Sequence, residues 1–336
     1  MKNFKRIFAV FFCLLLAAGI LGGCGKAESS SISAPSASQS GNKPLKIVTT
    51  IFPEYDWVRE ILGDKADHTE VTMLLDNGVD LHSYQPTADD IIKISDCDLF
   101  IYVGGESDGW VEDALKEATN KNVKVINLLD VLGEQVKEEE VVEGMEAEEE
   151  ESEDEDEPEY DEHVWLSLKN AETLCNAITD ALEEIDPANK DAYATNAASY
   201  LEKLAALDGE YQTVVDNAAR KTVLFGDRFP FRYLVDDYGL SYYAAFAGCS
   251  AETEASFETI SFLAGKVDEL GLPCVLTIDG AQHKIAETIV QNTTEKNQSI
   301  LTLDSMQSTT STDVANGTTY LSVMESNLDV LKQALN

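Results

Sequence analysis

Short runs of β-branched and other apolar residues alternate along most of the chain with longer segments whose apolar residues recur at helical spacing. In the first half this pattern predicts three helices and four strands, with the helices at 54–62, 88–94 and 111–118 and the strands at 46–51, 71–75, 99–103 and 123–128. In the second half it predicts helices at 230–238, 257–270, 285–292 and 320–335, each following one of the strands at 222–225, 242–246, 274–278 and 300–303. Apolar strands that alternate with helices are typical of parallel sheets covered on both faces.

Two further helices are predicted between these halves, at 168–185 and 190–219. The second runs for about 30 residues without a proline, which gives a length of roughly 45 Å. We therefore expect an α/β protein with two lobes, each a four-stranded, mostly parallel sheet with flanking helices, joined by one long rigid helix. The expected parts are an N-terminal lobe (44–167), a helical segment (168–220) and a C-terminal lobe (221–336). Because open α/β sheets bind ligands beyond the carboxyl ends of their strands, the cleft between the lobes is the expected site.

The N-terminus has the layout of an export signal. Lys2, Lys5 and Arg6 precede an apolar run from 7 to 21, which is shorter than the roughly 20 residues of a comfortable membrane span. The run ends in Leu-Gly-Gly before Cys24, which resembles a bacterial lipobox. We expect a lipoprotein signal peptide (1–23), a lipid anchor on Cys24, a flexible tether (24–43) and a protein held on the outer face of the cell membrane.

The net charge of the chain limits the molecules that it can bind. The formal net charge is −38, and the stretch from 138 to 162 contains no Lys or Arg. Nucleic acid is excluded as a partner, because phosphate binding requires a cationic surface. Like charges and few apolar residues predict a disordered or mobile acidic loop at 137–162. Two interpretations of this loop stay open: a weak collector of cations beside the cleft, or a solvated insert that keeps the protein soluble.

The spacing of the cysteines suggests neither disulfides nor a metal site. Beyond the anchor, the chain has Cys97, Cys175, Cys249 and Cys274, whose spacing matches no disulfide framework and includes no Cys-x-x-Cys pair. We interpret them as buried small apolar residues.

Histidines carry the chemical signal. The chain has four, and two of them fall at loop edges where the cleft is expected: His82 within DLHSYQP and His163 within DEHVWL. Imidazole suits transition metals such as zinc, copper, iron and manganese, whereas carboxylates favour harder ions. His68 and His283 lie in exposed-looking segments, and we interpret them as ordinary surface or core residues.

The two histidine blocks, 78–86 (GVDLHSYQP) and 162–166 (EHVWL), resemble the histidine motifs of zinc/manganese ABC-transporter substrate-binding proteins. Segments 231–240 (FRYLVDDYGL) and 303–320 are similar to later segments of that family, so the resemblance runs from about Lys43 to the C-terminus. It implies two α/β lobes joined by a long helix, a divalent metal ion buried between them, an ABC permease as partner, and a monomer.

Carried over by position, the resemblance makes His82 and His163 ligands from the first lobe and Asp304 a carboxylate ligand from the second. The family's remaining position, a His or Glu, falls on Arg228, and a guanidinium cannot ligate a cation. Asp227 is the proposed substitute, with helix capping as its alternative role and with Glu252 and Glu254 in reserve. Two imidazoles and two carboxylates would neutralise a divalent ion and leave no coordination position for catalysis.

Zinc is the expected ion and manganese the alternative. The place of the acidic loop, where zinc-specific relatives often carry a histidine-rich loop, favours zinc, whereas two carboxylate ligands suit Mn²⁺ at least as well. A surface adhesin would use the anchor and the acidic loop but would have no need of two histidine motifs. A hydrolase is disfavoured because the sequence has no Gly-x-Ser-x-Gly, Walker-type or His-Glu-x-x-His motif. We therefore expect a binding protein and not an enzyme.

Overall fold

The computed structural model describes residues 43–146, 159–250, 254–280 and 283–336. Several sequence-based predictions lie outside these residues: the signal peptide, the lipidated Cys24, nearly all of the tether, the centre of the acidic loop and the reserve ligand Glu252.

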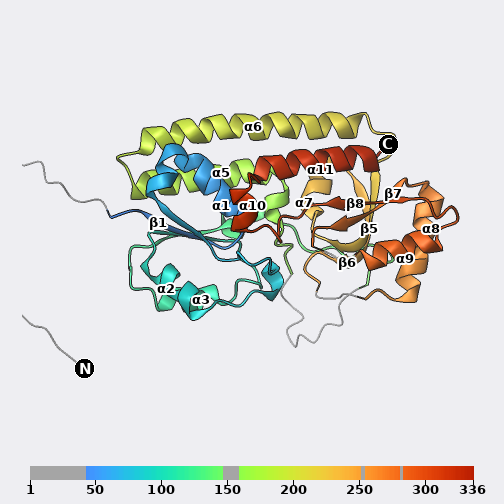
Figure 1. The fold of residues 1–336 in the computed structure, drawn as a ribbon, viewed down its shortest axis with the longest axis horizontal. Coiled ribbons are helices and arrows are strands. Elements are labelled where there is room, and N and C mark those ends of the chain that lie inside the picture. Colours follow the sequence, from blue (N-terminus) through green and yellow to red (C-terminus); the bar gives the residue numbers. More distant parts are fainter. Residues whose placement is uncertain (1–42, 147–158, 251–253, 281–282) are drawn as a thin grey trace, which may run out of the picture. The chain divides into compact units, whose positions relative to one another are not determined.

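The N-terminal half contains a four-stranded parallel sheet in the order β2-β1-β3-β4. The helices α1 and α5 lie on one face of this sheet, and α2 and α3 lie on the other (Figure 1). Most predicted bounds agree with the structure to within a few residues, because buried parallel strands are continuous apolar runs. The elements are β1 (Lys46–Thr49), α1 (Phe52–Leu62), β2 (Glu70–Met73), α2 (Ala88–Asp96), β3 (Leu99–Tyr102), α3 (Val111–Lys116), β4 (Lys124–Asn127) and α4 (Leu128–Leu132).

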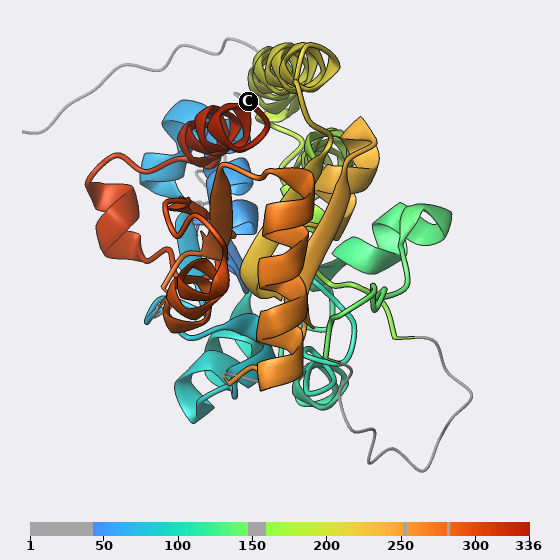
Figure 2. The ribbon, with the colours of Figure 1, turned by 90° about the vertical axis from the view of Figure 1, so that its right-hand side faces the viewer.

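The C-terminal half repeats the same architecture with a second parallel sheet, in the order β6-β5-β7-β8. Figure 2 views this sheet from the side of α8 and α9. Two parallel sheets with flanking helices confirm the predicted fold class. The elements are β5 (Thr222–Phe229), α7 (Arg232–Tyr238), β6 (Ser241–Ala247), α8 (Phe257–Leu270), β7 (Cys274–Ile278), α9 (Lys284–Asn292), β8 (Ser299–Leu303), α10 (Ser311–Ala315) and α11 (Tyr320–Ala334).

Two helices connect the halves, α5 (Leu168–Ile185) and the long α6 (Lys190–Asp216). The 27 residues of α6 run above both sheets in Figure 1 and pack on α1 and α5 at one end and on α7 and α11 at the other. Its buried positions recur every three or four residues, as expected of a helix that buries one stripe; they are Tyr193, Ala197, Tyr200, Leu204, Leu207, Tyr211 and Val215.

Buried aromatic side chains join the halves directly. The rings of Trp57 in α1 and Tyr320 in α11 meet edge to face with centroids 5.2 Å apart. The Tyr320 hydroxyl donates to the carbonyl oxygen of Trp165 (2.7 Å), and the Trp165 indole donates to the carbonyl oxygen of Ser305 (2.9 Å). Each of these buried hydrogen bonds contributes about 0.5–1.5 kcal/mol of net stability to the contact between the halves. The halves therefore form one packed body.

The acidic loop differs from its prediction at both ends. The backbone N–H of Lys137 donates to the Tyr233 hydroxyl (3.1 Å), and Glu138 pairs with Tyr160 in an isolated antiparallel bridge. Further along, Glu146 pairs with Phe246 of β6 in a parallel bridge. Backbone hydrogen bonds to an existing sheet offset the entropy cost of ordering these residues. Their like charges and few apolar side chains do not offset that cost. The prediction of disorder or mobility is therefore wrong for the ends of this segment, and its centre lies outside the described residues.

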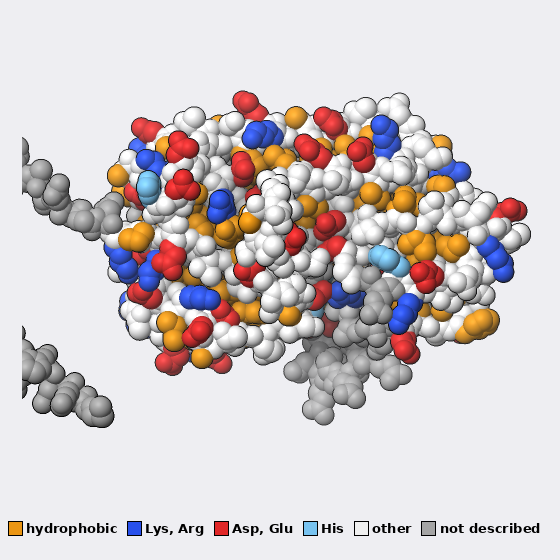
Figure 3. Space-filling view, viewed as in Figure 1, with side chains coloured by type: hydrophobic (Ala, Val, Ile, Leu, Met, Phe, Trp, Pro, Cys, Tyr) orange, Lys and Arg blue, Asp and Glu red, His pale blue; other side chains and the backbone are white. Residues whose placement is uncertain are grey.

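Within the described part of the chain, no helix combines the length and the apolar character required to cross a membrane. On the face shown in Figure 3, acidic side chains are spread among fewer basic ones rather than gathered in one patch.

Candidate metal centre

His82 lies in a short 3-10 turn (Leu81–Ser83) that follows β2. The Asp80 carboxylate caps this turn by accepting from the backbone N–H of His82 (3.1 Å). The His82 Nδ1 lies 2.8 Å from the Ser107 hydroxyl oxygen and 3.4 Å from a carboxylate oxygen of Glu162. The Ser107 hydroxyl can donate or accept, whereas the ionised Glu162 carboxylate only accepts, so this environment favours a proton on Nδ1 and a lone pair on Nε2.

His163 begins a second 3-10 turn (Val164–Leu166) and is completely buried. One carboxylate oxygen of Asp161 accepts from its backbone N–H (2.8 Å) and lies 3.0 Å from its Nδ1. The Trp165 ring packs beside the imidazole, with centroids 5.2 Å apart. The same logic therefore holds for this ring: Nδ1 faces a carboxylate, and the Nε2 lone pair is left to face the other histidine.

The two Nε2 atoms face each other at 3.1 Å. Two imidazole nitrogens bound to one tetrahedral zinc ion, with Zn–N of about 2.0–2.1 Å, lie roughly 3.3–3.4 Å apart. The observed separation needs only a few tenths of an ångström of adjustment to hold one ion. A carboxylate behind each ring is the usual support of a metal-binding histidine, because it fixes the tautomer and raises the basicity of the ligand nitrogen.

Glu162 connects this pair to the loop after β3. Its other carboxylate oxygen accepts from the backbone N–H of Ser107 (3.0 Å). Burial alone would raise the pKa of Glu162, but the hydrogen bonds from His82 and Ser107 outweigh it and hold that pKa below its ordinary value. Gly105 makes the close approach possible: its backbone has φ +81°, and a Cβ there would lie 2.2 Å from a Glu162 carboxylate oxygen.

Cys249 lies beside the two histidines. Among the described residues, the one cluster of His, Cys, Asp and Glu arranged to hold a metal consists of His82, His163 and Cys249, with one ligand atom from each, all within 4.8 Å of one another. Gly248 favours this approach, because a Cβ there would lie 2.9 Å from the Phe229 carbonyl oxygen and 3.1 Å from the imidazole carbon Cε1 of His163. The backbone N–H of Cys249 donates to a carboxylate oxygen of Glu139 (2.8 Å). Burial, together with nearby carboxylates, raises the pKa of the Cys249 thiol.

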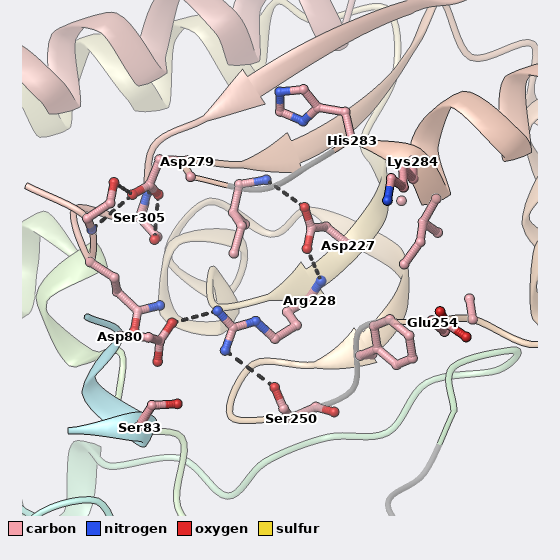
Figure 4. A pocket seen from close by; sticks show the side chains of 18 of the residues that line it. Asp80, Ser83, Asp227, Arg228, Ser250, Glu254, Asp279, His283, Lys284 and Ser305 are labelled. Atoms are coloured by element: carbon pink, nitrogen blue, oxygen red, sulfur yellow. Dashed lines mark hydrogen bonds and ion pairs between the residues drawn. The ribbon is translucent and has the colours of Figure 1, made fainter. Parts of the chain in front are cut away.

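Arg228 faces the site and forms an ion pair with Asp80. Its guanidinium lies 2.6 Å from the Asp80 carboxylate and also donates to the carbonyl oxygen of Ser250 (3.3 Å), as Figure 4 shows. Burial alone would raise the pKa of Asp80, but the Arg228 charge outweighs it and lowers that pKa. The arginine at the expected ligand position therefore neutralises a carboxylate of the other half.

Asp227 and Asp304, the predicted carboxylate ligands, lie outside the three-residue group. Asp227 is inside β5, where its carboxylate accepts from the backbone N–H groups of Arg228 (2.9 Å) and Ile278 (3.3 Å); burial raises its pKa. Asp304 accepts from the backbone N–H of Met306 (2.7 Å). Burial and the neighbouring Asp279 raise the pKa of Asp304 to about 6. Metal ligation by these two residues stays a prediction.

A cavity of about 840 Å³ adjoins the histidine pair. Asp80 and Gln307 line it and also contact the histidines, while Glu254, the reserve ligand, lies on its wall (Figure 4). Gln307 lies 3.4 Å from the Nε2 of His163. The remaining titratable groups on the wall come from β5, from the turn after β7 and from the start of α9 with its N-cap residue, and they are Asp227, Arg228, Asp279, His283 and Lys284. The wall of the cavity is thus largely polar, and the Asp80–Arg228 ion pair forms part of it.

Sequence reasoning did not identify the thiol at the site. Its interpretation as a small apolar residue fits Cys97, Cys175 and Cys274, which are buried, but Cys249 is partly exposed beside two imidazoles. The signal that could have found it is its position two residues beyond the carboxyl end of β6, the edge of the sheet where ligands bind.

The fold and the site together define a two-sheet α/β protein with a metal-capable imidazole pair where the two halves meet. The chain belongs to the family described as zinc-uptake complex component A, periplasmic (ZnuA), which matches residues 47–334. This confirms the membership predicted from the histidine motifs.

Curated relatives agree with this membership. The chain is 31% identical over 337 residues to the high-affinity zinc uptake system protein ZnuA of Bacillus subtilis, covering 99% of this chain and 98% of that protein. It is 33% identical over 290 residues to the zinc-binding lipoprotein AdcA of Streptococcus pneumoniae, covering 86% of this chain. The chain spans about half of AdcA, 55% of its length.

Solved structures show the same architecture. The Zn(II)-bound ZnuA-like domain of Streptococcus pneumoniae AdcA superposes with a TM-score of 0.67 at 30% identity, covering 87% of this chain and 99% of that domain. The metal-dependent lipoprotein YcdH from Bacillus subtilis superposes with a TM-score of 0.69 at 27% identity, covering 87% of this chain and all of that one.

Proposed function

We propose that this protein is the extracytoplasmic receptor of an ABC importer: it captures Zn²⁺ where its two lobes meet and delivers the ion to a membrane permease. The observation that carries this proposal is the convergence of the His82 and His163 Nε2 atoms, each with a carboxylate behind its ring. The names of the relatives, zinc-binding lipoprotein and zinc uptake system protein, support zinc as the ion.

The parts of the chain have separate roles in this proposal. Residues 44–167 and 221–336 act as lobes, 168–220 joins them, and residues 1–23 direct export. Cys24 carries the lipid anchor, in line with the name lipoprotein of a relative. A monomer receives the ion through the polar cavity, and the buried hydrogen bonds between the halves limit any rotation of one lobe against the other.

Binding and release follow from the site's own groups. His82 and His163 replace two waters of the hydrated ion without losing a proton, because their Nδ1 atoms already carry it. The role of Asp227 and Asp304 as carboxylates that close over the ion from the C-terminal lobe rests on the resemblance alone, since neither belongs to the metal-capable group of the described residues. Release requires the permease to loosen contacts of that lobe, because the histidine turns are fixed by buried groups such as Trp165.

Manganese is the second candidate, since carboxylates near the imidazoles suit a harder ion. Calorimetric titration of the purified chain with Zn²⁺ and separately with Mn²⁺ distinguishes the two. Tight one-to-one binding of Zn²⁺ with weak Mn²⁺ binding is the expected result. The reverse preference would keep the transport role and change the cargo. Absence of a tight site for either ion would overturn the proposal and favour an adhesin-like role.

A further inference from the structure

We propose that Cys249 supplies a thiolate ligand to the ion held by His82 and His163, which makes this a His2Cys site selective for zinc over manganese. This inference rests on the proposed function, because it concerns the same ion. It assigns the third ligand to a residue that neither the histidine motifs nor the carboxylate predictions include.

Geometry is the first argument. The ligand atoms of the three residues lie within 4.8 Å of one another. In a tetrahedral zinc site with Zn–S of about 2.3 Å, sulfur and nitrogen lie roughly 3.5 Å apart. The thiol therefore needs to approach by at most about 1.3 Å, which is within the reach of a side-chain rotation. By contrast, Asp227 and Asp304 are absent from every metal-capable group of the described residues.

The loop that carries Cys249 is the second argument. Gly248 lets the backbone pass between the Phe229 carbonyl oxygen and His163, where a Cβ would lie 2.9 Å from the first and 3.1 Å from the second. Glu139, from the ordered start of the acidic segment, accepts a hydrogen bond from the Cys249 backbone N–H and holds the loop from the other side. Two separate contacts thus fix the cysteine beside the imidazoles.

Charge is the third argument. Arg228, at the position where a ligand was expected, is ion-paired with Asp80 and cannot bind a cation. On binding, the Cys249 S–H bond breaks, its proton leaves to solvent, and the sulfur electron pair forms the bond to the metal. The thiolate and two neutral imidazoles leave a divalent ion with one positive charge, beside the carboxylates of Asp161 and Glu162. Thiolate is a soft ligand that favours zinc over manganese.

The test uses Co²⁺ as a spectroscopic probe and Zn²⁺ for affinity, on the full chain. Wild type should show visible d–d bands and a near-ultraviolet thiolate-to-cobalt charge-transfer band. Cys249→Ala should lose the charge-transfer band, keep d–d absorption from the histidine pair, and bind Zn²⁺ more weakly by roughly the 10–100-fold typical of disturbed metal sites or more. Cys274→Ala, which removes a buried thiol of β7, is the matched control and should change neither.

The outcomes separate the two proposals. Cobalt binding without the charge-transfer band, or equal Zn²⁺ affinity of the Cys249→Ala and Cys274→Ala variants, would overturn the thiolate ligand and leave the receptor intact. Wild type that binds neither metal would overturn both proposals. As a test of selectivity, Cys249→Asp should bring the Zn²⁺ and Mn²⁺ affinities closer together, because a carboxylate replaces the soft ligand. An unchanged ratio of affinities would contradict that claim.

Discussion

The Nε2 atoms of His82 and His163 lie 3.1 Å apart although the two residues are 81 positions apart in the sequence. Each ring has a carboxylate on its Nδ1 side, which favours the tautomer whose Nε2 lone pair points into the space between the rings. Without an ion, that space brings two acceptors together or holds a shared proton. The arrangement is therefore most stable with a cation between the rings.

Replacing either histidine should abolish tight zinc binding. We expect His82→Ala and His163→Ala each to weaken Zn²⁺ binding by on the order of 100-fold or more, since each removes a direct ligand, whereas even outer partners are worth about 10–100-fold. Calorimetric titration measures the change. His68→Ala is the control, because His68 is exposed and belongs to no metal-capable group of the described residues. Equal losses in all three variants would indicate a general effect on folding and contradict the assignment.

The carboxylates behind the rings should matter without touching the ion. Glu162→Gln keeps the size of the side chain but replaces an acceptor facing His82 with a group that also donates. We expect Zn²⁺ binding to weaken by roughly 10–100-fold, and Asp161→Asn to act similarly through His163. Glu106→Gln, an exposed carboxylate on the same loop as Ser107, serves as the control and should bind as wild type does. Wild-type affinity in Glu162→Gln would mean that the His82 ring binds zinc equally well without a carboxylate behind it.

The fold could be predicted because its strands are buried. A continuous apolar run such as β7 or β3 stands out against polar loops, and the long α6 has no internal proline. The helices α4 and α10 were missed, because five residues give too few turns to establish a helical period. The ordered ends of the acidic segment were missed for another reason. The backbone pairing of Glu146 with β6, and of Glu138 with Tyr160, depends on the tertiary structure and is not revealed by local charge.

The site could be predicted only in part. Motif resemblance identified both histidines, but no local pattern shows that residues so far apart in the sequence come together. Cys249 carries no signal by itself, and its role depends on Gly248 and on a loop whose path only the tertiary structure defines. Likewise, the resemblance placed Arg228 at an expected ligand position, whereas its ion pair with Asp80 depends on the meeting of the two halves.

A buried carboxyl in α1 predicts how stability depends on pH. Burial, and next the charge of Asp108, raise the pKa of Glu54 from 4.5 to about 8. Between these values the folded protein keeps a proton that the unfolded chain has released, so raising the pH favours unfolding. We expect the free energy of unfolding of the metal-free protein to fall as pH rises from 4.5 to about 8. Urea denaturation across this range measures the slope.

The Glu54→Gln variant tests the source of that slope. The substitution should only partly flatten the dependence of the free energy of unfolding on pH, because burial also raises the pKa of Asp56 to about 7. Glu112→Gln, at an exposed position of α3, makes the same chemical change and should leave the slope as it is in wild type. An identical slope in both variants would show that Glu54 does not hold its proton in the folded state.

The ion pair between Arg228 and Asp80 should weaken zinc binding. The Arg228 guanidinium places a positive charge beside the site and pairs with the Asp80 carboxylate, which lies 4.0 Å from the Nε2 of His82. Arg228→Ala removes that charge and frees Asp80 to face the ion. We expect the affinity for Zn²⁺ to rise by roughly tenfold, equivalent to about 1.4 kcal/mol. Arg228→Lys keeps the charge and is the control, with an affinity near that of wild type. A weaker affinity in Arg228→Ala, measured on protein that unfolds at the wild-type urea midpoint, would instead make Arg228 a support that holds Asp80 and the His82 turn in place.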